Sequence, residues 1–208
     1  SSNPWQKTGI NYRNDMDLES PYIDEIDQDN LFALSLRKPI SQKLLRLEEK
    51  QMFYELEWFR GFSSTVTILN QITKPEFDFS YIKEEQIKTE INKSSIGIKL
   101  RWNHKEEFIS GKFNRISIGS YYPVLELKYE MGIKDVLLSD FAYNKLSFKL
   151  LHDFSVSPFG RLYLTFSSGI NFDDVPYLLN YNPKANDTYY HNYRTFNNMN
   201  PYEFSLKE

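Results

Sequence analysis

Alternation of apolar and polar residues with a period of two is the feature that most restricts how this chain can fold. Residues 125–131 place Leu, Leu, Tyr and Met at every second position, with Glu, Lys and Glu between them. The pattern recurs at 146–150 and 162–167, within a stretch from Arg115 to Gly169 that reads as consecutive strands. Because successive side chains of a strand point to opposite faces, this pattern predicts a sheet with one apolar and one polar face.

Weaker alternation elsewhere predicts further strands of the same type. Two motifs, Phe59-Arg60-Gly61-Phe62 and Ser157-Pro158-Phe159-Gly160, read as tight turns, since Gly permits positive φ and Pro presets φ. We expect about eight strands, joined alternately by short and long connections as in transmembrane barrels. The additional strands are expected at 32–37, 44–58 (where the first residues could instead form a helical turn), around 66–68, 91–102 and 115–119.

Two segments lack the alternation. Residues 1–30 are polar and acidic, and their Asp spacing lacks the Gly and terminal Glu of a calcium loop, so we expect a linker or loop. Residues 171–200 are rich in Asn, Asp, Tyr and Pro, which predicts a long, ordered loop. Residues 31–208 would form one β-segment, and because 202–208 reads as the opening of another strand, we interpret the chain as a fragment.

Composition argues against several classes of function. A net charge of −3 gives nucleic-acid binding no electrostatic support. The absence of Cys excludes a thiolate metal site and a Cys nucleophile. His104, His152 and His191 lie far apart without metal-ligand spacing, and His152-Asp153 has no nucleophile elbow nearby. We therefore expect no cofactor, no metal and no enzymatic activity.

Aromatic residues make up 16% of the chain, and several stand at the ends of predicted strands. A barrel strand needs only about 9–11 residues, alternately apolar, to cross a bilayer, and Tyr and Trp gather at the interfaces. A soluble antiparallel sheet with one wet face would show the same alternation, but the aromatic strand ends favour lipid. The candidates for an aromatic girdle are Trp58, Trp102, Tyr121, Tyr122, Phe141 and Tyr143.

The charged face of such a sheet would line a hydrated barrel interior. In the 171–200 loop, Asp173 and Asp174 could bind a cation or accept hydrogen bonds from Arg194. The candidates for the interior face are Lys99, Arg101, Glu126, Lys128, Glu130, Lys145, Lys149 and Arg161.

Several segments, in order, resemble DUF5686, a family of Bacteroidota outer-membrane proteins of unknown function. The resemblance spans roughly 44–208, and implies a carboxypeptidase-regulatory-like domain ahead of a barrel similar to the Omp85 superfamily, which inserts or translocates proteins at outer membranes. Arg60-Gly61-Phe62 has the letters of an Omp85 motif but lies between early strands, so we do not transfer that role. The matching segments are 57–63 (EWFRGFS), 120–125 (SYYPVL), 132–134 (GIK), 139–146 (SDFAYNKL), 158–160 (PFG), 175–179 (VPYLL) and 196–204 (FNNMNPYEF).

Pattern and resemblance together predict an all-β fold, part of an antiparallel transmembrane β-barrel with long loops, in the bacterial outer membrane. The expected function is non-catalytic, in transport across the outer membrane or protein assembly there, with membrane lipid and other envelope proteins as partners. The alternative is a soluble antiparallel β-sheet protein that binds an extended ligand or partner on an aromatic-rich face. A third hypothesis, an outer-membrane phospholipase or protease, would need a convergent Ser/His/acid set around His152 and Asp153.

Overall fold

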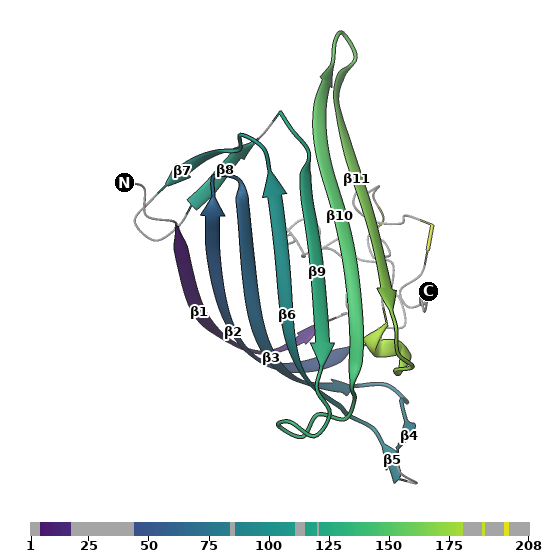
Figure 1. Cartoon of the computed structure of the whole chain (residues 1–208). Helices are drawn as coiled ribbons and strands as arrows, with labels where there is room; N and C mark the ends of the chain where they lie inside the picture. The colour runs from purple at the N-terminus through teal and green to yellow at the C-terminus, as the bar shows by residue number, and fades with distance from the viewer. Residues whose placement is uncertain are drawn as a thin grey trace.

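Seven strands form a single curved antiparallel sheet, which confirms the predicted all-β, antiparallel fold (Figure 1). The computed structural model describes residues 5–17, 44–83, 86–110, 115–119, 121–180, 189 and 198–199. No helix in these ranges combines the length and apolar character needed to cross a membrane. In their order across the sheet, the strands are β1 (Gln6–Asp17), β2 (Leu45–Phe59), β3 (Phe62–Pro75), β6 (Ile91–Asn103), β9 (Val124–Gly132), β10 (Tyr143–Val156) and β11 (Gly160–Asn171).

The sheet is a meander, in which each strand pairs with the sheet strands before and after it in the chain. Two small hairpins are inserted into its connections. One consists of β4 (Tyr81–Lys83) and β5 (Gln86–Lys88), between β3 and β6, and the other of β7 (Glu107–Ser110) and β8 (Arg115–Gly119), between β6 and β9. A short 3-10 helix, η1 (Tyr177–Leu179), follows β11. In the described part of the chain, β1 and β11 are the two edges of the sheet.

The two tight turns lie at one end of the sheet, at the top of Figure 1, which we call the turn end. Gly61 has φ +90 between β2 and β3, and a Cβ there would stand 1.9 Å from the carbonyl oxygen of Asn103, so this turn needs glycine. The opposite loop end carries β4–β5, the β9–β10 connection and η1. The predicted alternation of short and long connections holds only in part, because β7 and β8 form a long connection at the turn end.

Residues 6–17 were predicted to belong to an acidic linker, and that prediction is wrong. They form β1, which pairs with β2 along its whole length, from Gln6 opposite Leu56 to Asp17 opposite Leu45. Only Ile10, Tyr12 and Met16 supply its apolar side, and the polar residues between them hid the alternation. The predicted strand at 32–37 and nearly all of the 181–200 segment lie outside the described residues.

The other predicted strands are present, with altered ends. β10 extends from Tyr143 to Val156, beyond the alternating residues 146–150 at both ends. Two regions in which the alternation predicted no strand also contain short ones: the β4–β5 hairpin precedes β6, and β7 follows it. The ambiguous start of the 44–58 segment is strand, because β2 begins at Leu45.

Cross-strand register aligns the apolar residues into continuous rows on one side of the sheet, which we call the apolar face. Members of these rows are largely exposed; Ile68, for example, keeps 51% of its surface and Phe166 of β11 keeps 55%. One row is Ile10, Met52, Ile68, Ile96 and Met131, and the next is Tyr54, Val66, Ile98, Tyr129, Leu146 and Ile170.

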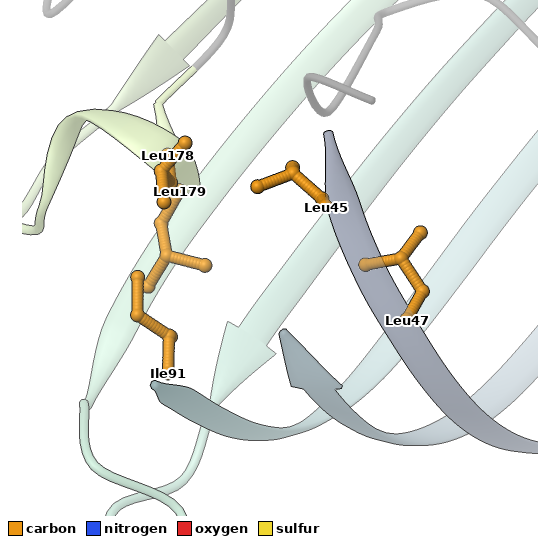
Figure 2. Close-up of a cluster of buried hydrophobic side chains, with 5 residues drawn as sticks. All are labelled: Leu45, Leu47, Ile91, Leu178 and Leu179. Atoms are coloured by element: carbon orange, nitrogen blue, oxygen red, sulfur yellow. The ribbon is translucent and has the colours of Figure 1, made fainter. Parts of the chain in front are cut away.

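The opposite, polar face is the more deeply buried one toward the loop end. Its buried side chains include Gln71, Thr73, Ser95, Lys145 and Ser147. The buried hydrophobic cluster lies on the same side: Leu45 and Leu47 of β2 and Ile91 of β6 converge with Leu178 and Leu179 of η1 (Figure 2). Burial is therefore inverted relative to a soluble sheet, with large apolar side chains outside and polar ones inside.

Candidate functional site on the polar face

The polar face brings together all of the charged residues that the sequence placed on one side of the sheet. Arg101 lies opposite Glu126, Lys99 opposite Lys128, and Glu130 opposite Lys145. Lys149 lies opposite Glu126. Arg161 belongs to the same face because it alternates with Thr165 and Ser167 along β11.

Lys145 is the most buried charged residue of this set, with 3% of its surface exposed. Its Nζ donates a hydrogen bond to the Leu179 carbonyl oxygen and lies 4.9 Å from the centre of the Tyr143 ring. The Tyr143 hydroxyl donates to Glu130 Oε1 at 2.7 Å, and Lys128 Nζ lies 3.2 Å from Glu130 Oε2. Two lysines, one carboxylate and one phenol thus form a compact, hydrogen-bonded cluster toward the loop end.

Glycine makes room for Tyr143 within this cluster. Gly132 of β9 is the cross-strand partner of Tyr143, and a Cβ there would stand 2.3 Å from the aromatic ring. A second pair of this kind joins β1 and β2, where a Cβ on Gly9 would stand 2.6 Å from the ring of Phe53. Aromatic rings that cover glycines across a strand pair pack a sheet face tightly and fix the register.

The segment after β11 folds back over the polar face and is held there by side chains of β10 and β11. Asp173 accepts hydrogen bonds from the backbone N–H of Asn144 at 2.6 Å and from its side-chain amide at 3.1 Å. Asn171 Nδ2 donates to Asn180 Oδ1 at 2.9 Å. Asp173 is therefore a structural anchor in this chain; Asp174 is exposed, and Arg194 lies outside the described residues.

A buried aspartate joins the β4–β5 hairpin to the sheet. Asp140 accepts hydrogen bonds from Lys88 Nζ at 2.5 Å, from the Tyr81 hydroxyl at 3.2 Å and from the Asn92 backbone N–H at 3.0 Å. Burial, followed by the nearby Asp140 carboxylate, raises the pKa of Tyr81 above its ordinary value, so this phenol stays protonated and can donate. Sequence reasoning did not single out Asp140, although it lies in the SDFAYNKL segment that carries the family resemblance.

A second buried carboxylate acts at the turn end. Glu106 has 1% of its surface exposed and receives two hydrogen bonds from Arg101, at 2.5 and 2.8 Å. Arg101 Nε also lies 3.4 Å from Glu126 Oε1 on β9. This bidentate ion pair holds the start of the β6–β9 connection against the polar face. Glu106 was not predicted from the sequence, because nothing local distinguishes it from Glu107.

The candidate girdle residues divide into two groups. Trp58, Trp102, Tyr121 and Tyr122 are exposed and lie at the turn end, where Trp58 Nε1 also donates to Ser64 Oγ at 2.8 Å. For Tyr143 the girdle prediction is wrong, because its ring is fully buried at 0% exposure on the polar face. Phe141 also departs from it, since it packs against the buried cluster at the loop end.

The site's chemistry is that of a polar, charged surface. The ring centre of His104 lies 4.7 Å from that of Tyr122, and the ring centre of His152 lies 5.2 Å from that of Phe154. The two histidines therefore have different aromatic neighbours. Across the described ranges, His, Cys, Asp and Glu form no group of three or more that could hold a metal ion. The buried charges instead bind loops and the η1 segment to the polar face.

The profile described as "Family of unknown function (DUF5686) C-terminal domain" matches residues 70–208, more than half of the chain. The chain belongs to the DUF5686 family. The DUF5686 domain begins within β3 and includes the Lys145 cluster, Asp140 and η1, whereas β1 and β2 precede it. No significant similarity links the chain to a curated protein or to a solved structure.

Proposed function

We propose that this chain forms part of a β-barrel in the bacterial outer membrane, with its apolar face against lipid and its polar face toward the interior. The observation that carries the proposal is the inverted burial. Contiguous apolar rows across neighbouring strands are exposed, while Lys145, Ser147 and Gln71 on the opposite face are buried. Large exposed apolar surfaces are costly in water and mark membrane or partner contacts.

Strand length supports the same proposal. The sheet strands range from 9 residues in β9 to 15 in β2, and about 9–11 tilted residues are enough to cross a bilayer. The sheet edges on β1 and β11 would pair with further strands in a closed barrel, since lipid offers unpaired backbone groups no hydrogen bonds.

The borders of the apolar rows also agree with a membrane location. At the loop end, the next row after Ile68 and Ile96 holds the polar residues Lys50, Asn70 and Ser94, with Tyr12 at its β1 edge. At the turn end, the exposed rings of Trp58 and Trp102 lie where an aromatic girdle would meet the headgroups. A belt of apolar side chains bordered in this way is the expected surface of a transmembrane barrel.

The proposed role is non-catalytic, in transport across the outer membrane or protein assembly there. The polar, charged face supports it, because such a face would give a barrel a hydrated interior. The Bacteroidota origin, the relation to Omp85 and the preceding carboxypeptidase-regulatory-like domain belong to the same proposal and rest on sequence resemblance.

Cell fractionation of the full-length protein tests the location. We expect it in the outer-membrane fraction, resistant to extraction by alkaline carbonate and soluble only with detergent. Recovery of folded protein in the aqueous fraction without detergent would instead favour a soluble sheet that binds a ligand on its aromatic-rich face. Single-channel conductance in planar bilayers then separates an open pore from an assembly factor whose interior stays closed.

A further inference from the structure

The connection between β9 and β10 exposes three consecutive apolar side chains at the loop end. Val136, Leu137 and Leu138 are all exposed, and Leu137 and Leu138 keep 67% and 82% of their surface. A short loop in water would be expected to carry polar residues at these positions, so a run of exposed aliphatic residues suggests a contact with something apolar.

The backbone of this loop is held in an unusual conformation. Asp135, Leu137 and Leu138 have φ values of 65, 50 and 65, in the left-handed region that bulky residues rarely adopt. Two hydrogen bonds close the loop: the Asp135 N–H donates to the Ser139 carbonyl, and the Ser139 N–H donates to the Val136 carbonyl, both at 3.0 Å. The surrounding structure therefore fixes a conformation that local preference would not select.

The loop folds toward the apolar face of the sheet. Asn70 Nδ2 donates to the Leu137 carbonyl at 3.4 Å and to Ser94 Oγ at 3.0 Å. Asn70 and Ser94 form the polar row directly beyond Ile68 and Ile96, on the apolar face. In Figure 1 the loop projects to the left of the lower ends of β9 and β10, while η1 and the β4–β5 hairpin lie to the right.

We propose that Val136, Leu137 and Leu138 insert into the lipid at the border of the membrane and anchor the loop end of the sheet. This inference rests on the proposed membrane location. Lipid is the occupant that fits because the loop continues the apolar face: its Leu137 carbonyl is bonded to Asn70 of the polar row, and the loop follows β9 directly beyond Met131. A protein partner would be needed only if this surface were separate from the lipid-facing rows.

Site-directed spin labelling in lipid vesicles tests the inference on the full-length protein. The 208 residues contain no Cys, so Leu138→Cys introduces a defined labelling site once any cysteine elsewhere in the protein is changed to Ser. Met131→Cys reports on the apolar face, and Asp78→Cys is a matched exposed position at the same end of the sheet, before β4. Val136→Cys provides a second loop label should Leu138→Cys fold poorly.

We expect labels at 138 and 131 to collide more often with oxygen, which enters lipid, than with a water-soluble nickel chelate. The label at 78 should show the reverse preference. If 138 behaves like 78 while 131 contacts lipid, the anchor is refuted and the barrel proposal stands. If 131 also prefers the nickel chelate, the membrane location itself fails. A label at 138 that neither reagent reaches would show that protein covers the loop, which also overturns the inference.

Discussion

The ring of Tyr143 occupies the space beside Gly132 that a Cβ would fill: such an atom would stand 2.3 Å from the ring. From this position the Tyr143 hydroxyl reaches Glu130 at 2.7 Å. The Gly132–Tyr143 pair therefore packs β9 against β10. It also directs the Tyr143 hydroxyl to the Glu130 carboxylate on the polar face.

Gly132→Ala should displace the Tyr143 ring and lower the free energy of unfolding by about 1–3 kcal/mol, as overpacking typically does. Gly97→Ala is the matched control, because the nearest atom to a Cβ there, the Tyr129 carbonyl oxygen, is at 3.6 Å, an ordinary contact. Urea unfolding of the full-length protein in detergent measures both. Equal losses for the two variants would contradict the packing role of Gly132.

Tyr143→Phe keeps the ring but removes the donor to Glu130. Because hydrogen bonds to charged groups contribute about 1.5–3 kcal/mol, we expect a loss in that range. Asn11→Ala removes a hydrogen bond of 3.1 Å to Gln51 Oε1 on the polar face, but this bond is exposed to water and uncharged, so its loss should cost less. The same unfolding measurement compares them, and a smaller effect for Tyr143→Phe would refute the ranking.

Lys88→Ala should loosen the β4–β5 hairpin more than Asp140→Asn does. Asp140 is buried, so loss of Lys88 removes a cation from a carboxylate that water cannot solvate, whereas Lys88 is partly exposed and can return to water. Hydrogen exchange of residues 81–88 reports on the hairpin directly. Faster exchange in Asp140→Asn than in Lys88→Ala would contradict this argument, because it would show that the hairpin tolerates loss of the cation better than loss of the carboxylate charge.

Leu127→Arg places a charge in the middle of the apolar face. Facing lipid near the bilayer midplane, this change should cost about 2–4 kcal/mol. In water the cost would be small, because Leu127 is exposed in the folded chain. Thr65→Arg, on the polar face between Glu55 and Lys99, places the same charge between an acidic and a basic neighbour; it is the control and should be nearly neutral. Unfolding in lipid vesicles gives both values, and a neutral Leu127→Arg would argue against lipid.

The sequence predicted the two-faced sheet because every second residue of β6, β9, β10 and β11 repeats the same character. It failed for β1, where Asn11, Arg13 and Asp15 on one side and Asn14 on the other leave few apolar positions. Buried carboxylates such as Asp140 also escaped prediction. Their partners are far away in sequence: Lys88 is 52 positions before Asp140.

The buried position of Tyr143 could have been predicted from its neighbours in the sequence. It alternates with Lys145, Ser147 and Lys149 along β10, so its side chain belongs to the polar face. Its position near a strand end suggested a place at the membrane interface. The alternation of side chains along the strand, however, decides which face a residue occupies. Phe53 follows the same rule on β2, where it alternates with Gln51 and Glu55.

A cysteine scan of β9 from 125 to 131, spin-labelled in lipid vesicles, tests the central claim most directly. The account predicts that labels at 125, 127, 129 and 131 collide mainly with oxygen, and that labels at 126 and 128 collide mainly with the nickel chelate; position 130 is left out because the Glu130 side chain is mostly buried and bonded to Tyr143. The accessibility ratio should therefore oscillate with a period of two. A scan in which the nickel chelate reaches 127 and 129 as readily as 128 would contradict the membrane location of the apolar face.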